Sequence, residues 1–369
     1  MNEIEIKKRK IIFLITGSDV GGAEIVVKNL MFNIDQEKFL PIFVSLRPLG
    51  KIGKEIGEKF RVVSLGAGMK FNPIFILRLF SLIKKEKPDI LHCHLFHANF
   101  LGRIFGKISG VPLIISTIHS DNFGGKLRYY LLKITDSLND VTVAVSQKIK
   151  EDLIKRKISP EHKIKVVYNG TKEGRMVAES DIQKTKRDLS IDNNSPIILS
   201  VGRLNPIKGH IYLIEAMELL KIKYPNFKLL LIGDGPEREN LENKTKQLCL
   251  SENILFLGEI REIDIYYKLA DIFVLPSVNE GFGLALIEAM SNRLLVVASR
   301  VGGVPEIIKE NVTGFMANPG DCKNLASVIE KSLSINSSEK EKIIKNAYQE
   351  FKDNFSLDKM MEGYYNIYK

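Results

Sequence analysis

Two glutamates frame a glycine-rich turn in the second half of the chain, in the stretch Glu280-Gly-Phe-Gly-Leu-Ala-Leu-Ile-Glu288. Residues 271–275 read as a strand that ends before Pro276, and residues 284–290 have helical spacing, so Glu280 falls in a loop and Glu288 on a helix. The first backbone N–H groups of a helix have no partner within it, and with the helix dipole they favour a phosphate. Carboxylates beside that anion should instead accept hydrogen bonds from sugar hydroxyls. The stretch therefore predicts a site for a phosphorylated sugar, with the phosphate at Gly281, Phe282, Gly283 and Leu284.

A second loop carries the positive charge that such a site requires. Residues 195–201 are rich in β-forming side chains and lead to Gly202, after which the loop carries Arg203 and Lys208. The fork of an arginine and the point charge of a lysine can straddle a diphosphate. An isolated pair of this kind would read as solvated surface cations. Together with the two glutamates, we interpret it as a diphosphate site.

These motifs and others resemble glycosyltransferase family 4, whose members are retaining enzymes of the GT-B architecture. The first half of the chain contributes Gly21-Gly-Ala-Glu24, Pro88-Asp-Ile-Leu-His-Cys-His94 and Thr117-Ile-His119. Besides the glutamate stretch and the cationic loop, the second half contributes Gly233-Asp-Gly-Pro236, Phe256-Leu-Gly258 and Gly302-Gly-Val-Pro-Glu306. Each motif alone is weak, but their order and spacing extend over nearly the whole chain and together are specific.

The resemblance implies roles for the residues of the second half. Glu288 would bind the ribose hydroxyls, and Glu280 would face the donor sugar near its C3 and C4 hydroxyls and stabilise charge at the anomeric carbon. Arg203 and Lys208 would hold the diphosphate and stabilise the leaving group. The turn that contains Ile260 would meet the nucleobase through its backbone.

Two residues of the first half are also implied as site residues. Gly22 would let the first loop approach the same phosphates. His119 would lie near the C6 hydroxyl of the sugar, although a lone histidine after a β run is more often structural. Departures from the family pattern at 169–172 and 291–295 lie outside the predicted phosphate contacts.

A histidine-rich run raises the question of a metal site. His92, Cys93, His94 and His97 lie within a few residues of one another, but the run contains no carboxylate, and the resembled family needs no metal for transfer. We therefore expect no metal and no cofactor, the nucleotide sugar being a substrate. Since no residue is placed as a covalent nucleophile, the resemblance implies front-face attack, in which a departing phosphate oxygen helps to take the acceptor proton.

Alternating strands and helices must position these residues. Short β runs occupy 11–15, 40–46, 61–64, 90–93, 113–117, 141–144 and 165–167, and then 197–201, 228–232, 254–257, 272–275 and 296–299. With helical patterns between most of them, they predict an α/β fold of the GT-B type. Two Rossmann-like, doubly wound parallel-sheet domains would face each other across a cleft.

The predicted domain ranges follow from this alternation. We expect an acceptor-binding domain at 1–175, a donor-binding domain at 176–345, and C-terminal helices at 346–369 that return to the first domain. The polar stretch 169–194 lacks apolar periodicity and is interpreted as the interdomain connection with its flanks.

Composition narrows the class of protein and its partners. The chain has 369 residues, 44% of them hydrophobic, and three scattered cysteines, which favours a cytoplasmic protein without a disulfide framework. A net charge of +10 exceeds the need of a nucleotide-sugar pocket, yet no nucleic-acid-binding motif is present. An anionic membrane surface is the partner that this charge favours, with peripheral binding on the inner face of the cell membrane. The segment 74–87, apolar with Lys84, Lys85 and Lys87 at its end, could contribute, or it could be an ordinary helix packed on the sheet.

The predicted activity is transfer of a hexose or N-acetylhexosamine from a UDP-sugar to a hydroxyl of a glycan or polyprenyl-linked acceptor, in surface polysaccharide or glycolipid biosynthesis. GDP-mannose is the second candidate for the donor, after the UDP-sugars. Four alternatives remain open. A phosphorylase or starch-type synthase would share the glutamates, but the chain is short for either, and a nucleic-acid binder would owe its positive charge to phosphate contacts. A GT-B nucleotide-sugar epimerase would share the fold but would not be expected to carry the glutamate pair, and a basic, non-catalytic binding module would have lost at least one of the site residues.

Overall fold

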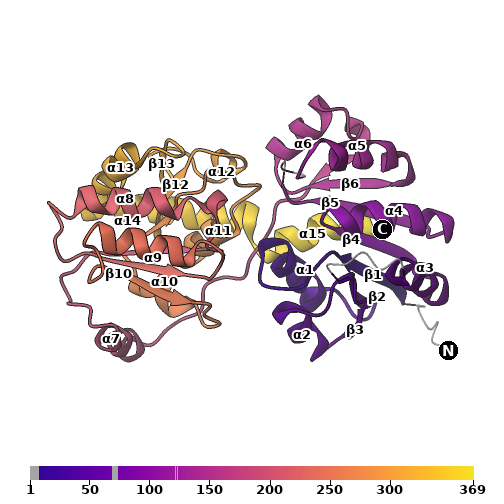
Figure 1. The fold of residues 1–369 in the computed structure, drawn as a ribbon, viewed down its shortest axis with the longest axis horizontal. Coiled ribbons are helices and arrows are strands. Elements are labelled where there is room, and N and C mark those ends of the chain that lie inside the picture. Colours follow the sequence, from indigo (N-terminus) through magenta and orange to yellow (C-terminus); the bar gives the residue numbers. More distant parts are fainter. Residues whose placement is uncertain (1–7, 69–73, 121, 123) are drawn as a thin grey trace, which may run out of the picture. The chain divides into compact units, whose positions relative to one another are not determined.

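The computed structural model describes residues 8–68, 74–120, 122 and 124–369, and the chain divides into two compact units (Figure 1). Unit 1 contains Met1–Asn169 together with Leu357–Lys369, and unit 2 contains Gly170–Ser356. The ranges predicted from the sequence, 1–175, 176–345 and 346–369, differ from this division at both junctions. Each unit has its own parallel sheet with helices on both sides, as the sequence predicts for a doubly wound α/β fold.

The sheet of unit 1 has the strand order β3-β2-β1-β4-β5-β6-β7, and all of its pairs are parallel. The strands are β1 (Arg9–Ile15), β2 (Phe39–Ser45), β3 (Arg61–Ser64), β4 (Ile90–His94), β5 (Leu113–Ile118), β6 (Val141–Ala144) and β7 (Ile164–Val166). All the strands expected before Asn169 are confirmed, two of them with the predicted ends and the others with ends shifted by one or two residues. The order reverses between β1 and β4, so this is the topological switch point of the unit.

Alternating residues of β1 explain why helices cover both faces of this sheet. Ile11 and Phe13 join one core with α1 (Gly22–Asn33), α2 (Lys51–Gly57) and the last helix, α15 (Leu357–Tyr368). Ile12 and Leu14 join a second core with α3 (Ile74–Glu86) and α4 (Phe96–Ile108). A strand alternates its side chains between the two faces, so a run that is apolar throughout must be buried on both. Helices α5 (Lys126–Thr135) and α6 (Gln147–Lys155) complete the unit, with α4 packed against both α3 and α5.

The sheet of unit 2 has the order β10-β9-β8-β11-β12-β13, again with parallel pairs. Its strands are β8 (Ile197–Val201), β9 (Lys228–Ile232), β10 (Ile254–Gly258), β11 (Ile272–Leu275), β12 (Leu295–Ser299) and β13 (Phe315–Ala317). The sequence predicted the first five and missed β13, which is only three residues long. Here the switch point lies between β8 and β11.

The helices of unit 2 follow the same doubly wound pattern. Helices α8 (His210–Leu220), α9 (Arg238–Gln247) and α13 (Cys322–Ser334) share one core with the sheet, while α10 (Asp264–Leu269) and α11 (Leu284–Ser291) contact β8, β11 and β12. Shorter elements are η3 (Pro206–Lys208) and α12 (Val304–Ile307). The predicted terminal helices appear as α14 (Ser337–Glu350), a π-helical turn at Phe351–Phe355, and α15.

One stretch differs from its prediction. Residues 169–194, interpreted as a connection because they lack apolar periodicity, contain the helix α7 (Glu179–Asp188). No residue of α7 is buried, so tertiary packing of an apolar face does not explain it. Acidic residues in its first turn and basic residues in its last complement the helix dipole, and Gln183 donates a hydrogen bond to Glu179 one turn earlier.

No helix within the described residues is both long and apolar enough to span a bilayer.

Candidate active site

The loops that follow β8 and β11 meet at the switch point of unit 2. The loop after β8 ends in η3, where Asn205 caps the turn by accepting a hydrogen bond from the backbone N–H of Lys208. The Lys208 ammonium lies 2.6 Å from a carboxylate oxygen of Glu280, and the Ser277 hydroxyl donates to the same oxygen at 3.3 Å. Both partners of the ion pair are partly buried. The structure thus brings together a predicted diphosphate residue and a predicted sugar residue that are 72 positions apart in the sequence.

Helix α11 begins directly after this loop. Its N-cap, Gly283, has φ of 108°, a conformation that residues with a Cβ rarely adopt. A second glycine lets another loop approach from the side: a Cβ on Gly302 would lie 1.6 Å from the carbonyl oxygen of Glu280. The backbone N–H of Gly303 donates to that same oxygen at 3.3 Å. The Gly302-Gly303 motif therefore fixes the backbone of Glu280, a role that its sequence did not reveal.

Glu288 lies one turn further along α11. The hydroxyl of the buried Tyr267, on α10, donates its one proton to a carboxylate oxygen of Glu288 at 3.1 Å and shares it with the carbonyl oxygen of Ala285, which lies at 3.4 Å. As predicted from the sequence, Glu280 lies in the loop and Glu288 on the helix. Their roles toward a ligand remain predictions.

The other predicted residues of unit 2 surround the same strand ends. Arg203 is exposed, and its loop is pressed against the turn after β9, because a Cβ on Gly233 would lie 2.1 Å from the carbonyl oxygen of Gly202. The turn after β10 begins at Gly258, which has φ of 68° and accepts a hydrogen bond from the Gly233 N–H, and it leads to the half-buried Ile260. Three neighbouring strands thus present their loops at one edge of the sheet, where ligands bind in folds of this type.

The two predicted residues of unit 1 lie at the carboxyl ends of its strands. Gly22 is exposed at the first position of α1, where an added Cβ would meet nothing within 4 Å. His119 follows β5, and its Nε2 lies 3.0 Å from Nδ1 of His94. Burial lowers the pKa of His119 to about 4, so the ring is neutral at pH 7. The structure places these residues in unit 1 and the remaining predicted site residues in unit 2.

The histidine run has structural partners rather than a cluster of ligands. His92 contacts the Tyr368 hydroxyl through Nδ1 and the Thr117 hydroxyl through Nε2, both at 2.7 Å. Burial lowers the pKa of His92 to about 3 and that of His94 well below its ordinary value. Over the residues that the structure describes, no group of three or more histidine, cysteine or acidic side chains is arranged to hold a metal ion.

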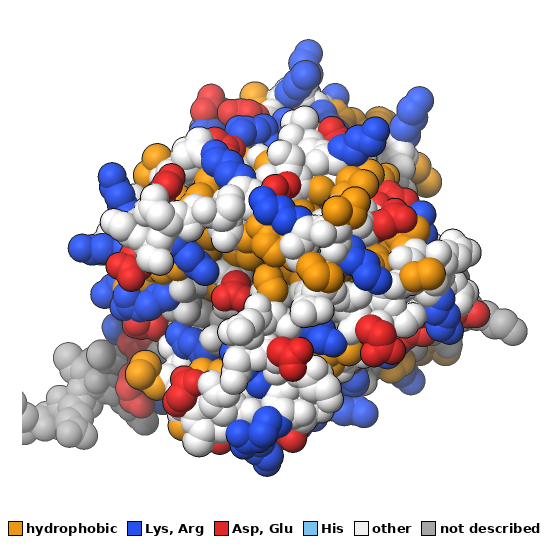
Figure 2. All heavy atoms as spheres, turned by 90° about the vertical axis from the view of Figure 1, so that its left-hand side faces the viewer, with side chains coloured by type: hydrophobic (Ala, Val, Ile, Leu, Met, Phe, Trp, Pro, Cys, Tyr) orange, Lys and Arg blue, Asp and Glu red, His pale blue; other side chains and the backbone are white. Residues whose placement is uncertain are grey.

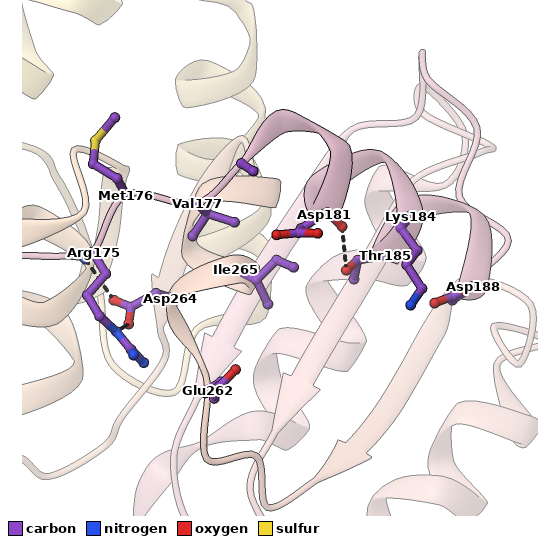
Figure 3. Close-up of a pocket in the computed structure, with 11 residues that line it drawn as sticks. Arg175, Met176, Val177, Asp181, Lys184, Thr185, Asp188, Glu262, Asp264 and Ile265 are labelled. Atoms are coloured by element: carbon purple, nitrogen blue, oxygen red, sulfur yellow. Dashed lines mark hydrogen bonds and ion pairs between the residues drawn. The ribbon is translucent and has the colours of Figure 1, made fainter.

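A surface pocket of unit 2 lies away from these residues (Figure 3). It is lined by the segment Arg175–Ala178, by α7 residues such as Lys184, and by Glu262, Asp264 and Ile265. Arg175 spans its edge, with an ion pair to Asp264 at 2.8 Å. None of the predicted site residues lines this pocket, so the candidate site rests on the strand ends described above.

Comparisons with known proteins identify the family. A sequence model described as Glycosyltransferase Family 4 matches residues 20–175, and one described as Glycosyl transferases group 1 matches residues 181–350. An uncharacterized glycosyltransferase of Methanocaldococcus jannaschii is 32% identical over 302 residues, which cover 77% of this chain and 76% of that protein. The chain belongs to glycosyltransferase family 4. The resemblance drawn from the motifs is therefore confirmed, and the protein is a glycosyltransferase.

Two further relatives bear on this family 4 member. The Escherichia coli protein named UDP-Gal:alpha-D-GlcNAc-diphosphoundecaprenol alpha-1,3-galactosyltransferase is 30% identical over 267 residues, covering 69% of this chain and 68% of that one. The crystal structure of Anabaena HepE in complex with UDP and glucose is similar with a TM-score of 0.86, over 97% of this chain and 98% of that chain, at 21% identity. The latter comparison shows the shared GT-B fold.

Sequence reasoning missed several members of the site in this glycosyltransferase. Ser277 and Tyr267 contact the two glutamates, yet serine and tyrosine are common residues, and no motif marks Tyr267. Ser277 stands three residues before Glu280, a distance that a loop can close, and this was the one available signal. The sequence offers His94 as part of a family motif and of a possible metal site, but not as a partner of His119, with which the structure pairs it.

Proposed function

We propose that this glycosyltransferase moves a hexose or N-acetylhexosamine from a UDP-sugar to a hydroxyl of a glycan or lipid-linked acceptor, with retention at the anomeric carbon and without a metal ion. The observation that carries the proposal is the 2.6 Å contact between Lys208 and Glu280 at the switch point, beside the start of α11. A cation suited to a phosphate and a carboxylate suited to sugar hydroxyls are held on adjacent loops. The names of the relatives support the choice of substrates, since one acts with UDP-Gal and a diphosphoundecaprenol-linked sugar and another was crystallised with UDP and glucose.

The proposed reaction breaks the bond between the anomeric carbon and the diphosphate oxygen and forms a bond from the acceptor oxygen on the same face. The acceptor proton passes to the departing phosphate oxygen. Arg203 and Lys208 stabilise the negative charge that develops there, and Glu280 stabilises the positive charge at the anomeric carbon. The fixed backbone of Glu280 and the cap on the Lys208 turn mean that little reorganisation is needed during the reaction. His119 contributes a neutral imidazole for a sugar hydroxyl.

A panel of nucleotide sugars tests the donor first. A ligand that binds only the folded chain raises its melting temperature. At a ligand concentration one hundred times Kd, the free energy of unfolding increases by about 2.7 kcal/mol. We expect UDP-sugars to give the largest shift, and a shift with GDP-mannose alone would contradict the choice of base. Chelation with EDTA should leave transfer unchanged; loss of activity that a divalent ion restores would contradict metal independence.

The product then tests the reaction. NMR of the isolated product should show the anomeric configuration of the donor. An inverted linkage would contradict retention, and an epimerised sugar with free UDP and no acceptor product would favour the epimerase alternative.

An apolar and basic surface on unit 1 supports the proposals of a membrane partner and a lipid-linked acceptor. Three apolar side chains of α5 recur at helical spacing on its exposed side: Leu127, Tyr130 and Ile134, with exposures of 70%, 58% and 49%. The same helix exposes Lys126, Arg128 and Lys133 and has no acidic residue. Such a face fits the surface of an anionic bilayer, where apolar groups enter the interface and each cation contributes about 1 kcal/mol.

Helices α3 and α4 continue this surface. Helix α4 packs against both α3 and α5, and it exposes Lys107 and Ile108 at its end. Helix α3 packs on the sheet, as the alternative reading of segment 74–87 held, but it also exposes Leu77 and carries Lys84 and Lys85 on its outer side. On the face of unit 2 that Figure 2 shows, basic, acidic and apolar side chains are interspersed. By contrast, helices α3, α4 and α5 expose apolar and basic side chains and no acidic one.

Vesicle sedimentation tests this surface. Binding should require phosphatidylglycerol, fall as salt rises, and drop roughly tenfold in the double variant Leu127→Gln/Ile134→Gln. The matched control is Ile222→Gln, because Ile222 is 91% exposed but belongs to unit 2. Equal, negligible binding to neutral and anionic vesicles at low salt would contradict the membrane proposal.

A further inference from the structure

Tyr267 is the buried neighbour of a predicted ligand residue and is not itself placed to serve as one. It lies on α10, and its ring packs in a tilted arrangement against Phe273 of β11 at 5.9 Å. Its hydroxyl reaches α11, where it bridges two groups one helical turn apart, the carbonyl oxygen of Ala285 and the carboxylate of Glu288. A residue needed only to fill the core could be phenylalanine, so the hydroxyl requires its own explanation.

The direction of these hydrogen bonds is unambiguous. A carbonyl oxygen and an ionised carboxylate can only accept, so the phenol is the donor. Burial, and then the charge of Glu288, raise the pKa of Tyr267 well above its ordinary value, which keeps the proton on the phenol across the working pH range. A hydrogen bond to a charged acceptor in a buried setting is also stronger than a neutral one.

We propose that Tyr267 is a positioning residue for the nucleotide: by holding one carboxylate oxygen of Glu288, it sets the orientation in which Glu288 accepts hydrogen bonds from the ribose hydroxyls. The inference rests on the proposed function, which assigns the ribose to Glu288. A carboxylate has about four acceptor positions, and the tyrosine takes up one of them. A flexible glutamate would lose side-chain entropy on binding the ribose, and a carboxylate held in advance has already lost it. Tyr267, Glu288 and the loops of the donor site all belong to unit 2.

A nucleotide cycle separates this role from a merely structural one. The affinities of wild type and Tyr267→Phe are measured by calorimetry for UDP and for 2′,3′-dideoxy-UDP, which lacks both ribose hydroxyls. We expect Tyr267→Phe to lower the affinity for UDP by roughly three- to tenfold, because the hydroxyl makes one charge-assisted hydrogen bond. The affinity for the dideoxy nucleotide should fall by less than about twofold in this variant, since that nucleotide has no ribose hydroxyl for Glu288 to bind.

Two outcomes would overturn the inference, and they differ in whether the assignment of the ribose to Glu288 survives. If wild type prefers UDP over the dideoxy nucleotide but Tyr267→Phe weakens both equally, Tyr267 is structural and the ribose assignment of Glu288 stands. If wild type does not discriminate between the two nucleotides, the ribose assignment itself fails, and the positioning role fails with it.

A matched variant controls for the loss of a phenol from α10. Tyr266→Phe removes a hydroxyl from the adjacent position of the same helix, and the structure gives that hydroxyl no hydrogen bond to any described residue. It should leave both affinities unchanged. Thermal unfolding establishes that Tyr267→Phe folds, and if it does not, Tyr267→Met, which also lacks the hydroxyl and can fill the core, replaces it. Unchanged discrimination in the folded variant would again overturn the inference.

Discussion

At the scale of the residue, the two cations of the loop after β8 have contrasting surroundings. Lys208 is held by Glu280, whereas the side chain of Arg203 is exposed and has no hydrogen bond or ion pair with the described residues. An arginine that does nothing for the fold is free to serve a ligand. Its contribution to stability should therefore be small while its contribution to catalysis is large.

Arg203→Ala should lower turnover by at least about a hundredfold, the usual result of removing one preorganised charge at a leaving group. The free energy of unfolding should change by less than about 0.5 kcal/mol, as for most surface substitutions. Steady-state kinetics and urea unfolding measure the two effects. Arg187→Ala, an exposed arginine of α7, should change neither. Turnover near wild type in folded Arg203→Ala would remove this residue from the site.

Gly302 gives a second prediction at this scale. A Cβ at this position would overlap the carbonyl oxygen of Glu280, and φ of 52° is itself unfavourable for other residues. Gly302→Ala should displace the Glu280 loop, lowering both turnover and the melting temperature, which enzyme assays and calorimetry would record. Gly57→Ala, whose Cβ would meet Val62 at an ordinary 3.6 Å, is the control. Normal kinetics in Gly302→Ala would contradict a tight fit between these loops.

The candidate site was predictable from the sequence to the extent that its residues follow strand ends in motifs. Arg203, Lys208, Glu280 and Glu288 were found this way because each stands at a fixed offset from a glycine turn. Tyr267 was not, because its hydroxyl reaches Glu288 from a different helix, a tertiary contact that no local pattern encodes. Contacts made by common residues across tertiary structure are invisible to motif reasoning.

At the scale of the element, helix α15 connects the end of the described chain to the sheet of unit 1. Its Met360, Tyr364 and Tyr368 enter the core with Phe13, and Tyr368 also contacts His92. The sequence predicted a terminal helix that returns to the first domain, but only from the family resemblance. Its polar contact with the histidine run could not be predicted, because the partners are 276 positions apart.

Tyr368→Phe should leave Nδ1 of His92 buried without a partner. This costs about 1–3 kcal/mol, equivalent to a fall of several degrees in the melting temperature of unit 1. Calorimetry would detect it. Tyr130→Phe, at an exposed tyrosine, should have no such effect. If the two variants unfold alike, the Tyr368 contact contributes nothing to stability.

Helix α7 and strand β13 show where pattern reasoning fails at this scale. Helix α7 has no apolar stripe to detect, and β13 is too short for its alternation to be read. Strands such as β9, β11 and β12 were predicted well, because each is a mainly apolar run that is almost entirely buried.

At the scale of the whole molecule, buried histidines should make the stability of unit 1 more sensitive to acid than that of unit 2. Burial lowers the pKa of His92 to about 3 and those of His119 and His210 to about 4, and His94 is lowered as well. In the unfolded chain these groups titrate near 6.5, so below that pH the unfolded state binds more protons. Stability is therefore full above pH 6.5 and falls as the pH drops toward 4.

Each such histidine contributes a slope of about 1.4 kcal/mol per pH unit in this window. His92, His94 and His119 belong to unit 1 and only His210 to unit 2, so unit 1 should lose stability faster between pH 6.5 and 5. Hydrogen exchange read by mass spectrometry in each unit would measure the difference. His210→Asn should flatten the dependence of unit 2 alone. Equal acid sensitivity of the two units would contradict the prediction.

The discontinuous make-up of unit 1 bears on how the protein is synthesised. Residues 8–169 leave the ribosome first, yet their core includes α15, which is translated only after every residue of unit 2. Domains ordinarily fold in the order in which they emerge. Here the nascent first half cannot complete its core until α15 is translated, so part of the apolar surface of its sheet stays uncovered. The contiguous second half can fold completely before then. The candidate site of unit 2 would then form before unit 1 completes its fold, and the uncovered apolar surface of unit 1 is where chaperones would bind.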